Sequence, residues 1–335
     1  MNSLNMRWHG IAVAWLLLSF TTIFADQKNG WKIGFSRENI TPTTSMWMSG
    51  YASRDHGAEG TRTGLWAKGM AMEDANGQRA LLLTLDLVGV SVDVTGPVRQ
   101  ELAGRHDLKI KDILINCSHT HTGPVVGENL RTMYLLEENE SKLLLDYTAQ
   151  LKRRLVMLGE RAFADLKPSH LRAGQSHATF ATNRRQNPES HAEAWRASGK
   201  LKGPVDYSVP ILEIRDEQNE LQGLVFGYAC HATVLSDYRW SGDYPGYAQS
   251  YLEEQYEGIQ AMFWAGCGAD INPLPRRKVE LAQKYGKELS QAVVSGLAGV
   301  LDTVDPTLET KYVEIPLLYD TLPTKTDFET EASSQ

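Results

Sequence analysis

The sequence has few cysteines, no cluster of basic residues and a single long hydrophobic run, and each scarcity excludes a class of protein. The sequence has three cysteines, Cys117, Cys230 and Cys267. An odd number cannot all pair within one chain, so they do not form a disulfide scaffold, although one disulfide is compatible with an exported protein. The formal net charge of −7, without a basic cluster, argues against a nucleic-acid partner. A chain of 335 residues is long enough for one large α/β domain or two modest ones.

The one long hydrophobic run lies at the N-terminus. Residues 1–25 contain Arg7, then an apolar stretch at 11–20, then a small-residue cleavage site at Ala25, a pattern typical of a secretory signal peptide. The stretch is short for a membrane span, so an uncleaved N-terminal anchor is the alternative interpretation. We expect a secreted or periplasmic protein whose main domain is formed by residues 28–335.

The most informative stretch is the sequence Ile113-Leu-Ile-Asn-Cys-Ser-His119-Thr-His121-Thr-Gly-Pro124. It begins as an apolar run typical of a buried strand and ends at a Gly-Pro turn signal. Two imidazoles spaced i, i+2 on an extended backbone point to the same side. Neutral imidazole is a common zinc ligand, and the loop after a strand is where α/β sheets bind their ligands. The stretch therefore predicts a metal or ligand site.

The surrounding pattern predicts an α/β fold. A near-continuous apolar run at 79–87 is followed by a helix candidate at 92–106 and then by the strand at 113–117. This order predicts a right-handed crossover between parallel strands, which would place Asp86 and His119 near one sheet edge. Further strands are predicted at 31–42, 65–72, 170–182, 209–214, 223–231 and 260–264, further helices at 135–166, 247–256 (with Asp243 as cap) and 280–301, and a loop at 186–207. We expect a single main domain with a mixed, largely parallel sheet covered by helices.

Three of the predicted strands end in residues of chemical interest, at 118–121, 230–231 and 266–270. A lone histidine is more often a hydrogen-bonding residue than a ligand, but three such strand ends in one α/β pattern favour a metal site. Asp270 fits a turn residue and a site residue equally well, and Cys267 fits a packing role better than a nucleophile. The remaining histidines in polar contexts are expected to face solvent: His56, His106, His170, His177 and His191.

Six motifs together resemble the neutral/alkaline ceramidase family, in that family's order, from about Ile33 to Leu301. They are Ile40-Thr-Pro42 with Gly50-Tyr51, the stretch 116–124, Asn183-Arg184, Ala229-Cys-His-Ala-Thr233, Ser241-Gly-Asp243 with Gly246-Tyr-Ala248, and Gly266-Cys-Gly-Ala-Asp270-Ile-Asn272-Pro273.

The resemblance implies a zinc site and an activity. It implies that His119 and His231 are zinc ligands, that His121 lies beside the metal and helps to hold or polarise an amide carbonyl, and that Arg184 lines the same pocket. The implied reaction is hydrolysis of an N-acylsphingosine (ceramide) or related lipid amide to a sphingoid base and a fatty acid, with peripheral membrane contact. Zinc with an open position supports this chemistry, because it lowers the pKa of bound water from 15.7 to about 7 and polarises a carbonyl.

Two departures from the family pattern keep alternatives open. Asn272 stands where ceramide-cleaving relatives carry a serine; asparagine cannot act as that serine does, although its amide can bind an oxyanion. The family's glutamate and tyrosine ligands come from further along a longer chain, so this sequence is interpreted as a truncated, divergent member, or as one in which Asp86 or Asp270 completes the shell. The alternative functions are a zinc hydrolase of another amide or ester and a non-catalytic exported binding protein. A barrel amidohydrolase fits less well, because its H-x-H lies near the start of its domain.

Overall fold

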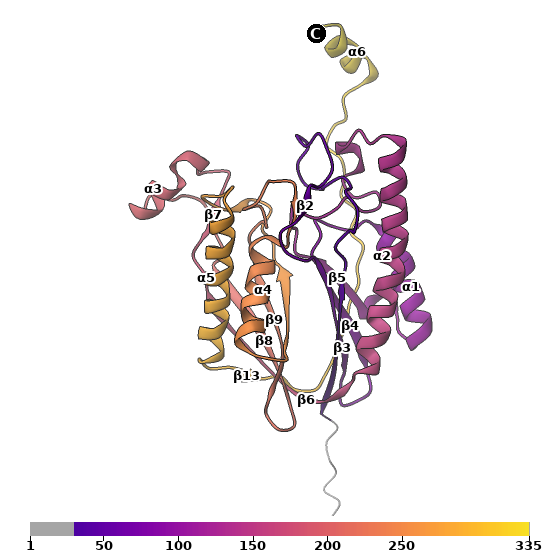
Figure 1. Ribbon diagram of the computed structural model, residues 1–335, viewed down its shortest axis with the longest axis vertical. Helices are drawn as coiled ribbons and strands as arrows, with labels where there is room; N and C mark the ends of the chain where they lie inside the picture. The colour runs from indigo at the N-terminus through magenta and orange to yellow at the C-terminus, as the bar shows by residue number, and fades with distance from the viewer. Residues whose placement is uncertain (1–29, 335) are drawn as a thin grey trace, which may run out of the picture.

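Helices cover the two outer faces of a curled β-sheet in the computed structural model, which describes residues 30–334 (Figure 1). The predicted signal peptide at 1–25 lies outside these residues. The strands are β1 (Trp31–Asn39), β2 (Gly60–Thr61), β3 (Trp66–Glu73), β4 (Arg79–Leu85), β5 (Ile113–Cys117), β6 (Lys167–His177), β7 (Ala181–Asn183), β8 (Ser208–Asp216), β9 (Leu221–Tyr228), β10 (Arg239–Trp240), β11 (Gln260–Ala265), β12 (Ile271–Pro273) and β13 (Asp302–Thr303). The α-helices are α1 (Val92–His106), α2 (Glu138–Ala164), α3 (Ala192–Ala197), α4 (Asp243–Gln255), α5 (Val279–Leu297) and α6 (Lys325–Ser333), and the 3₁₀ helices are η1 (Ile110–Asp112), η2 (Arg131–Met133) and η3 (Glu189–His191).

The main sheet has the strand order β11-β9-β8-β6-β1-β3-β4-β5, with β13 paired to β6. The predicted mixed sheet of the α/β class is confirmed, but the predicted predominance of parallel pairs is wrong. Within the main sheet only β4–β5 and β9–β11 are parallel among the described residues. Two of the antiparallel pairs, β3–β4 and β8–β9, are hairpins joined by short turns, and a hairpin can only produce antiparallel neighbours. The pairs β1–β3, β1–β6 and β6–β8 are also antiparallel, through longer connections.

The predicted crossover from β4 through α1 to β5 is confirmed. Helix α1 occupies residues 92–106, as predicted, and buries Val94, Val98 and Leu102. Strands β4 and β5 are parallel, with Leu85 opposite Cys117. Both strands therefore end at the same edge of the sheet, where the loop that carries His119 and His121 begins.

The sheet is buried on both faces, and the alternation of side chains along its strands divides the core into three clusters. In β4, Leu81 and Leu83 face α1 and α2, whereas Leu82 faces the inner side of the sheet. In β11, Phe263 packs with the cluster under α4 and α5, whereas Met262 faces the same inner side as Leu82. The inner cluster therefore lies between two halves of one sheet, and each half carries its own pair of helices (Figure 1).

This curling brings the two ends of the strand order together. Strands β5 and β11 are the outermost strands, yet they contact each other. The Asn116 side chain of β5 hydrogen-bonds both the N–H and the C=O of Ala265 in β11. The Lys68 ammonium also donates to the carbonyl of Ala261, at 2.7 Å. The loop after β5 and the loop after β11 therefore lie side by side.

The structure corrects two smaller predictions, on the loop at 186–207 and on the cap of α4, and it decides the state of the cysteines. The predicted loop at 186–207 contains the short helix α3, so it is partly ordered by helical hydrogen bonds. Helix α4 begins at Asp243, with Gly242 and not Asp243 as its N-cap. The Asp243 carboxylate accepts from the backbone N–H of Leu235 at 2.8 Å and from that of Tyr244, in the first turn of the helix, at 2.6 Å. The three cysteines are all free in the structure. No helix within residues 30–334 has the length and hydrophobicity needed to cross a bilayer.

Candidate metal centre

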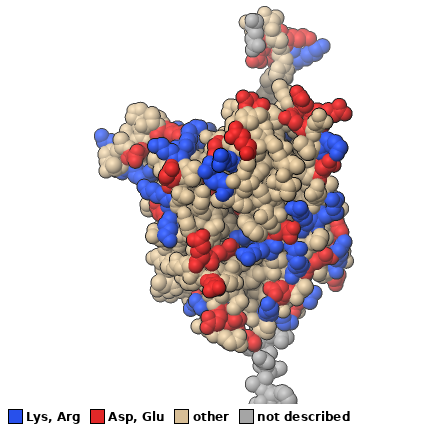
Figure 2. Space-filling model, viewed as in Figure 1, with Lys and Arg blue, Asp and Glu red and all other residues tan. Residues whose placement is uncertain are grey.

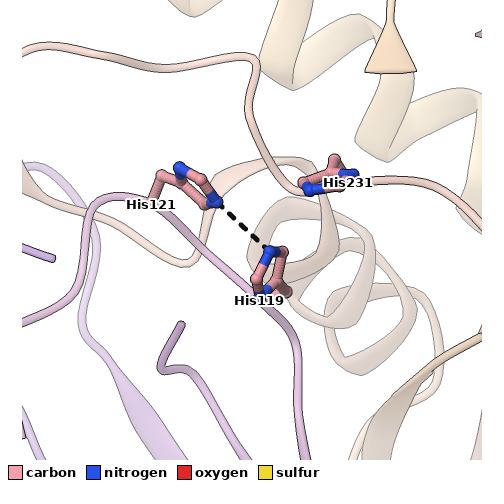
Figure 3. Close-up of side chains that lie close together, drawn as sticks. All are labelled: His119, His121 and His231. Atoms are coloured by element: carbon pink, nitrogen blue, oxygen red, sulfur yellow. Dashed lines mark hydrogen bonds between the residues drawn. The ribbon is translucent and has the colours of Figure 1, made fainter. Parts of the chain in front are cut away.

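Three histidines meet where the loops after β5 and β9 approach each other. The side chains of His119, His121 and His231 each offer a ring nitrogen, and these nitrogens lie within 4.8 Å of one another (Figure 3). The ring centroids of His119 and His231 are 4.7 Å apart, and His121 Nε2 lies 3.3 Å from His119 Nε2. All three residues are partly buried. Residues 119 and 231, distant in sequence, therefore lie close enough to bind one ion.

Backbone carbonyls fix the rings of His119 and His231. His119 Nδ1 lies 2.6 Å from the carbonyl oxygen of Val88, and His231 Nδ1 lies 2.6 Å from that of Gly268. A carbonyl only accepts, so each Nδ1 carries the proton and each Nε2 carries a lone pair. The lone pair on His119 Nε2 accepts from the Nε2–H of His121 at 3.3 Å. Metal-binding histidines in proteins are commonly oriented by such a bond on the other ring nitrogen.

The backbone around the H-x-H motif differs from the predicted extended form. His119 has φ of +62°, in the left-handed region that non-glycine residues rarely occupy. Its N–H donates to the carbonyl of Leu87 at 2.9 Å, which stabilises the sharp turn after β5. The rings of His119 and His121 therefore meet through a turn and not through the alternation of a strand.

His121 is held from the other side by residues that sequence reasoning did not identify. The buried guanidinium of Arg54 donates to the carbonyl oxygens of Ser49, His121 and Asp237 at 2.7, 2.8 and 3.2 Å. The ring of Tyr51 packs edge-on against the His121 ring, with centroids 4.9 Å apart. Gly50 and Tyr51 were recognised only as part of a motif, and Arg54 gave no sequence signal, because its role is to bind carbonyls from three separate loops.

The two threonines of the same motif also have a structural role. Thr120 Oγ1 and Thr122 Oγ1 both donate to the carbonyl of Ser241, at 2.7 Å each. Both threonines are fully buried. They attach the histidine loop to the segment that precedes α4.

The surroundings keep two of the imidazoles uncharged near neutral pH. Burial lowers the pKa of His121 to about 3, with further lowering by the neighbouring His119, His231 and Arg54. Burial also lowers the pKa of His231 to about 4, helped by His119 and Arg184. A histidine must be neutral to bind a metal, so these two side chains are already in the protonation state that metal binding requires. The Nε2 atom of His121 faces His119, whereas its Nδ1 faces Gly50 and is buried without a hydrogen-bond partner.

The other predicted site residues, Arg184, Asp270 and Asn272, form hydrogen bonds near the β7–β12 pair. The N–H of Arg184 donates to the carbonyl of Asp270 at 2.8 Å, and the Asp270 carboxylate accepts from the Asn183 side chain at 3.1 Å. Asn272 is buried in β12, and its Oδ1 accepts from the Thr233 hydroxyl at 3.4 Å. Among the described residues the metal-binding group contains only the three histidines, so neither Asp270 nor Asp86 contributes an oxygen to it.

Asp86 was expected near His119 and to have a polar partner. Its carboxylate accepts from the N–H of Trp66 at 3.0 Å and from the Gln249 amide at 3.5 Å. Burial raises the pKa of Asp86 to about 6, against the lowering effect of Lys68. The residue therefore lies at the predicted sheet edge, but its side chain is used to connect β3 and α4.

A cavity of about 430 Å³ adjoins the cluster on the side of β5 and β11. The rings of His119 and His231 line it together with all three cysteines and the glycine-rich loop after β11, and its lining residues are Asn116, Cys117, His119, Cys230, His231, Ala265, Gly266, Cys267, Gly268 and Ala269. Burial raises the pKa of Cys117 to about 12 and that of Cys230 well above its usual value, so both are packing residues. Cys267 is exposed at the edge of the cavity.

The remaining histidines are mostly exposed, as predicted. His56, His170, His177 and His191 face solvent. His106 is an exception: it is half-buried, and its ring stacks on Phe163 with centroids 4.4 Å apart. It lies at the end of α1, before β5 begins, whereas the cluster lies after β5 ends. His106 is therefore at the other end of the strands and does not belong to the site.

Comparison with known proteins agrees with the fold and with the family that the motifs resemble. The family model for the N-terminal part of neutral/alkaline non-lysosomal ceramidase matches residues 31–297. The chain belongs to this family. The neutral ceramidase of Pseudomonas aeruginosa is 26% identical over 259 residues, which cover 72% of this chain and 37% of that protein. Neutral ceramidase 2 of Arabidopsis thaliana is 26% identical over 251 residues, which cover 73% of this chain and 32% of that protein.

The family's solved structures share the fold. A ceramidase complexed with C2 matches with a TM-score of 0.67 and 19% identity, covering 82% of this chain and 45% of the other. The crystal structure of the neutral ceramidase from Pseudomonas aeruginosa matches with a TM-score of 0.67 and 21% identity, covering 82% and 46%. The matched region thus spans about a third of the length of the curated relatives and just under half of the solved chains.

Proposed function

We propose that the protein is a zinc-dependent amide hydrolase of ceramidase type, which converts N-acylsphingosine (ceramide) or a related lipid amide to a sphingoid base and a fatty acid. One observation carries the proposal. His119 and His231 each use Nδ1–H on a backbone carbonyl, at 2.6 Å, so their Nε2 lone pairs are available at a common point. Nitrogen ligands of this kind suit zinc.

The residues of the cluster have separate roles in this proposal. His119 and His231 hold the ion, His121 holds or polarises the amide carbonyl beside it, and Arg184 borders the pocket. Zinc, when bound, supplies a Lewis acid that polarises the carbonyl and makes water acidic enough to attack near neutral pH. The cavity of about 430 Å³ beside His119 and His231 has room for the acyl or amine part of a substrate.

Asn272 and Asp270 support the site from the β7–β12 ribbon. Asn272 occupies the position that the resemblance gives to serine, and Thr233 donates to its Oδ1, so the amide NH₂ remains the donor that could stabilise an oxyanion. The Asp270 carbonyl accepts from the N–H of Arg184, and this bond positions the arginine.

Metal analysis tests the zinc site. The purified protein is expected to retain about one zinc per chain after dialysis, and His119→Ala and His231→Ala are expected to lose it. His170→Ala, which removes an exposed histidine from β6, is the matched control. Unchanged zinc content in both cluster variants would remove the proposed mechanism.

A second candidate is a zinc hydrolase of another amide or ester on the same scaffold, favoured by the buried Asn272 in place of a serine. A panel of N-acylsphingosines and short N-acyl amino compounds separates the two. Turnover of the short compounds alone would select this second candidate, and zinc binding without any turnover would select a non-catalytic binding protein.

We also propose that residues 1–25 direct export, so that the domain works in the periplasm or outside the cell with peripheral membrane contact. Cell fractionation of the full chain and of a chain without residues 1–25 tests this proposal. Equal retention of both forms in the cytoplasm would contradict it.

A further inference from the structure

Four large apolar side chains are exposed beside the loop that carries His119 and His121. One is the first residue of α1, and three lie between Pro124 and the start of α2: Val92, Leu130, Met133 and Leu135, with exposed fractions of 80, 38, 37 and 95%. The two segments contact each other, because the N–H of Glu128 donates to the Ser91 hydroxyl oxygen at 3.2 Å. We call these four side chains the apolar loop surface. Exposed apolar surfaces of this kind commonly mark sites of interaction.

A buried tyrosine connects this surface to the histidine cluster. Tyr134 lies between Met133 and Leu135, but only 4% of it is exposed. Its hydroxyl oxygen accepts from the N–H of Gly50 at 2.7 Å. Gly50 packs against the imidazole of His121, since a Cβ at Gly50 would lie 2.4 Å from Cγ of His121. The apolar loop surface therefore has a fixed position relative to the cluster.

An arginine holds the loop in shape. The Arg131 guanidinium donates to the carbonyl of Tyr134 at 3.1 Å and to the Ser141 hydroxyl at 3.2 Å. These two bonds close the loop onto the start of α2. The exposed side chains are thus presented by an ordered turn, which includes the 3₁₀ helix η2.

The surroundings of the apolar loop surface are acidic. Residues 127–146 contain five Asp and Glu but only two Lys and Arg. Figure 2 shows a broad area of uncharged side chains in the upper part of the molecule, with acidic side chains along its upper border. Like charges that face each other cost free energy, so this surface disfavours both an anionic membrane and a second copy of itself. A lipid surface without net charge does not meet this repulsion.

We infer that the apolar loop surface docks the protein onto a lipid bilayer with zwitterionic or uncharged headgroups and holds the histidine cluster at that bilayer. The inference rests on the proposed hydrolysis of a lipid amide, and it names the surface that makes the membrane contact. A lipid substrate must leave a bilayer to reach the cavity beside His119 and His231, so docking near the histidine loop shortens its path. Aliphatic side chains that enter the boundary between headgroups and acyl chains supply the binding free energy.

A second group of exposed apolar side chains competes for this role. It lies in the segment that leads to α6 and contains Val313, Ile315, Leu317, Leu318 and Tyr319. Figure 1 shows this segment leaving the body of the molecule before α6. Within residues 30–334, no hydrogen bond joins residues 313–322 to the histidine loop, so docking through this segment would not fix the position of the cluster.

Vesicle binding tests the inference without zinc or turnover. The protein is used without residues 1–25, because their apolar run would itself bind lipid, and residues 30–334 contain the whole sheet and its helices. Sedimentation with phosphatidylcholine vesicles measures the partition coefficient. We expect Leu135→Ser to lower it about tenfold, and Met133→Ser with Leu135→Ser to lower it further, because each removes apolar surface that the bilayer buries. Phosphatidylglycerol vesicles should bind the wild-type protein more weakly at low ionic strength, and added salt should reduce that difference.

Val300→Ser is the matched control. Val300 is 91% exposed, close to the 95% of Leu135, so neither replacement disturbs the core. It follows α5, a helix of 19 residues that begins shortly after β12, so it lies at the opposite end of the molecule (Figure 1). Its partition coefficient should equal that of the wild-type protein.

Hydrolysis, where it occurs, gives a separate readout. The loop variants should lower the rate with an amide embedded in phosphatidylcholine vesicles relative to the rate with a short, water-soluble amide. Vesicle binding that is weakened in the loop variants supports the inference even if no amide is hydrolysed and the proposed function fails. Amide hydrolysis by a protein that does not bind phosphatidylcholine vesicles leaves the proposed function intact and overturns the inference.

Three further outcomes overturn the docking surface. The first is a partition coefficient for Leu135→Ser equal to that of the wild-type protein. The second is binding that is lost only in Leu317→Ser with Leu318→Ser, which would assign docking to the segment before α6. The third is a dimer in sedimentation velocity that Leu135→Ser dissociates, which would assign the surface to a second copy of the chain.

Discussion

The side-chain amide of Asn116 pairs with the backbone of Ala265 as a neighbouring strand would. Its Oδ1 accepts from the N–H of Ala265 at 2.9 Å, and its Nδ2 donates to the carbonyl of the same residue at 3.2 Å. One side chain thus joins β5, which leads to His119, to β11, which leads to the loop whose Gly268 carbonyl orients His231. The two halves of the candidate metal centre are connected through this contact.

Replacing Asn116 is therefore expected to affect both stability and metal binding. Asn116→Leu removes both hydrogen bonds and leaves the partly buried N–H and C=O of Ala265 without partners, which should lower the free energy of unfolding by roughly 1–3 kcal/mol. Zinc affinity should fall about tenfold or more, because the loop positions relax. Urea unfolding and zinc competition titration measure the two effects, and Asn76→Ala in the exposed turn before β4 is the control. An unchanged zinc affinity would show that the two loops hold their positions without this contact.

The contact between β5 and β11 also marks the limit of what the sequence predicts. Apolar periodicity locates α1 and α5 and most of the strands, because it reports burial along a local stretch. The H-x-H motif and Cys230-His231 at strand ends identify the three histidines for the same local reason. The curling of the sheet is not local. It depends on the side chains of Lys68 and Asn116, which bind carbonyls of β11 that lie 193 and 149 residues further along the chain.

Arg54 and His119 illustrate two further reasons for missed features. Arg54 lies in a polar loop, and nothing in its neighbours indicates that it is buried and binds three carbonyls. His119 adopts a left-handed backbone that residue preferences assign to glycine or asparagine. Features that depend on tertiary contacts, or that run against local preference, require the structure.

Gly50 gives a sharp test of His121, because its missing side chain leaves space for the imidazole. A Cβ at Gly50 would lie 2.4 Å from Cγ of His121, and Gly50 has φ of +100°. Gly77 has a similar φ of +79°, but a Cβ there meets nothing within 4 Å. Gly50→Ala and Gly77→Ala should therefore share a backbone cost of about 1–2 kcal/mol.

Only Gly50→Ala should also displace the imidazole ring. We expect its zinc affinity and kcat to fall ten- to hundredfold, whereas Gly77→Ala keeps the values of the wild-type protein. Thermal unfolding, zinc titration and amide hydrolysis are measured for both variants. Equal zinc affinity and activity in the two variants would mean that the position of the His121 ring does not matter to the site.

Arg54 is expected to stabilise the His121 loop through its geometry as well as its charge. Arg54→Met removes all the hydrogen bonds to the carbonyls of Ser49, His121 and Asp237, so the free energy of unfolding should fall by about 3 kcal/mol, at roughly 1 kcal/mol for each bond. Arg54→Lys keeps the charge but cannot reach the three oxygens together, so its free energy of unfolding should lie between those of Arg54→Met and the wild-type protein.

The comparison between Arg54→Lys and Arg54→Met separates the two contributions. Chemical denaturation gives stability, and zinc titration below the unfolding transition gives metal affinity for the folded fraction. The Arg153→Gln variant on the surface of α2 corrects for the loss of an arginine. Wild-type zinc affinity in a destabilised but folded Arg54→Met protein would limit Arg54 to a purely structural role.

The stability of the metal-free protein should depend on pH through His121. Burial lowers its pKa to about 3 in the folded protein, with added lowering by the other two histidines and Arg54, whereas the unfolded chain has the ordinary value of 6.5. Below pH 6.5 the unfolded chain therefore binds a proton that folded His121 does not bind, and the folded state loses about 1.4 kcal/mol per pH unit as the pH falls. Above pH 6.5 the residue is neutral in both states and contributes no pH dependence.

Comparison with a variant isolates this contribution. Between pH 7 and pH 5 the wild-type protein should lose about 2 kcal/mol more of its free energy of unfolding than His121→Gln does. Asp86 and Asp243, whose pKa values burial raises to about 6, act in the opposite direction over part of this range, but they are present in both proteins and cancel in the difference. Urea unfolding is measured at each pH with EDTA present, and His170→Gln corrects for the loss of one histidine. Parallel pH curves for the wild-type protein and His121→Gln would mean that His121 takes up its proton as readily in the folded state as in the unfolded chain.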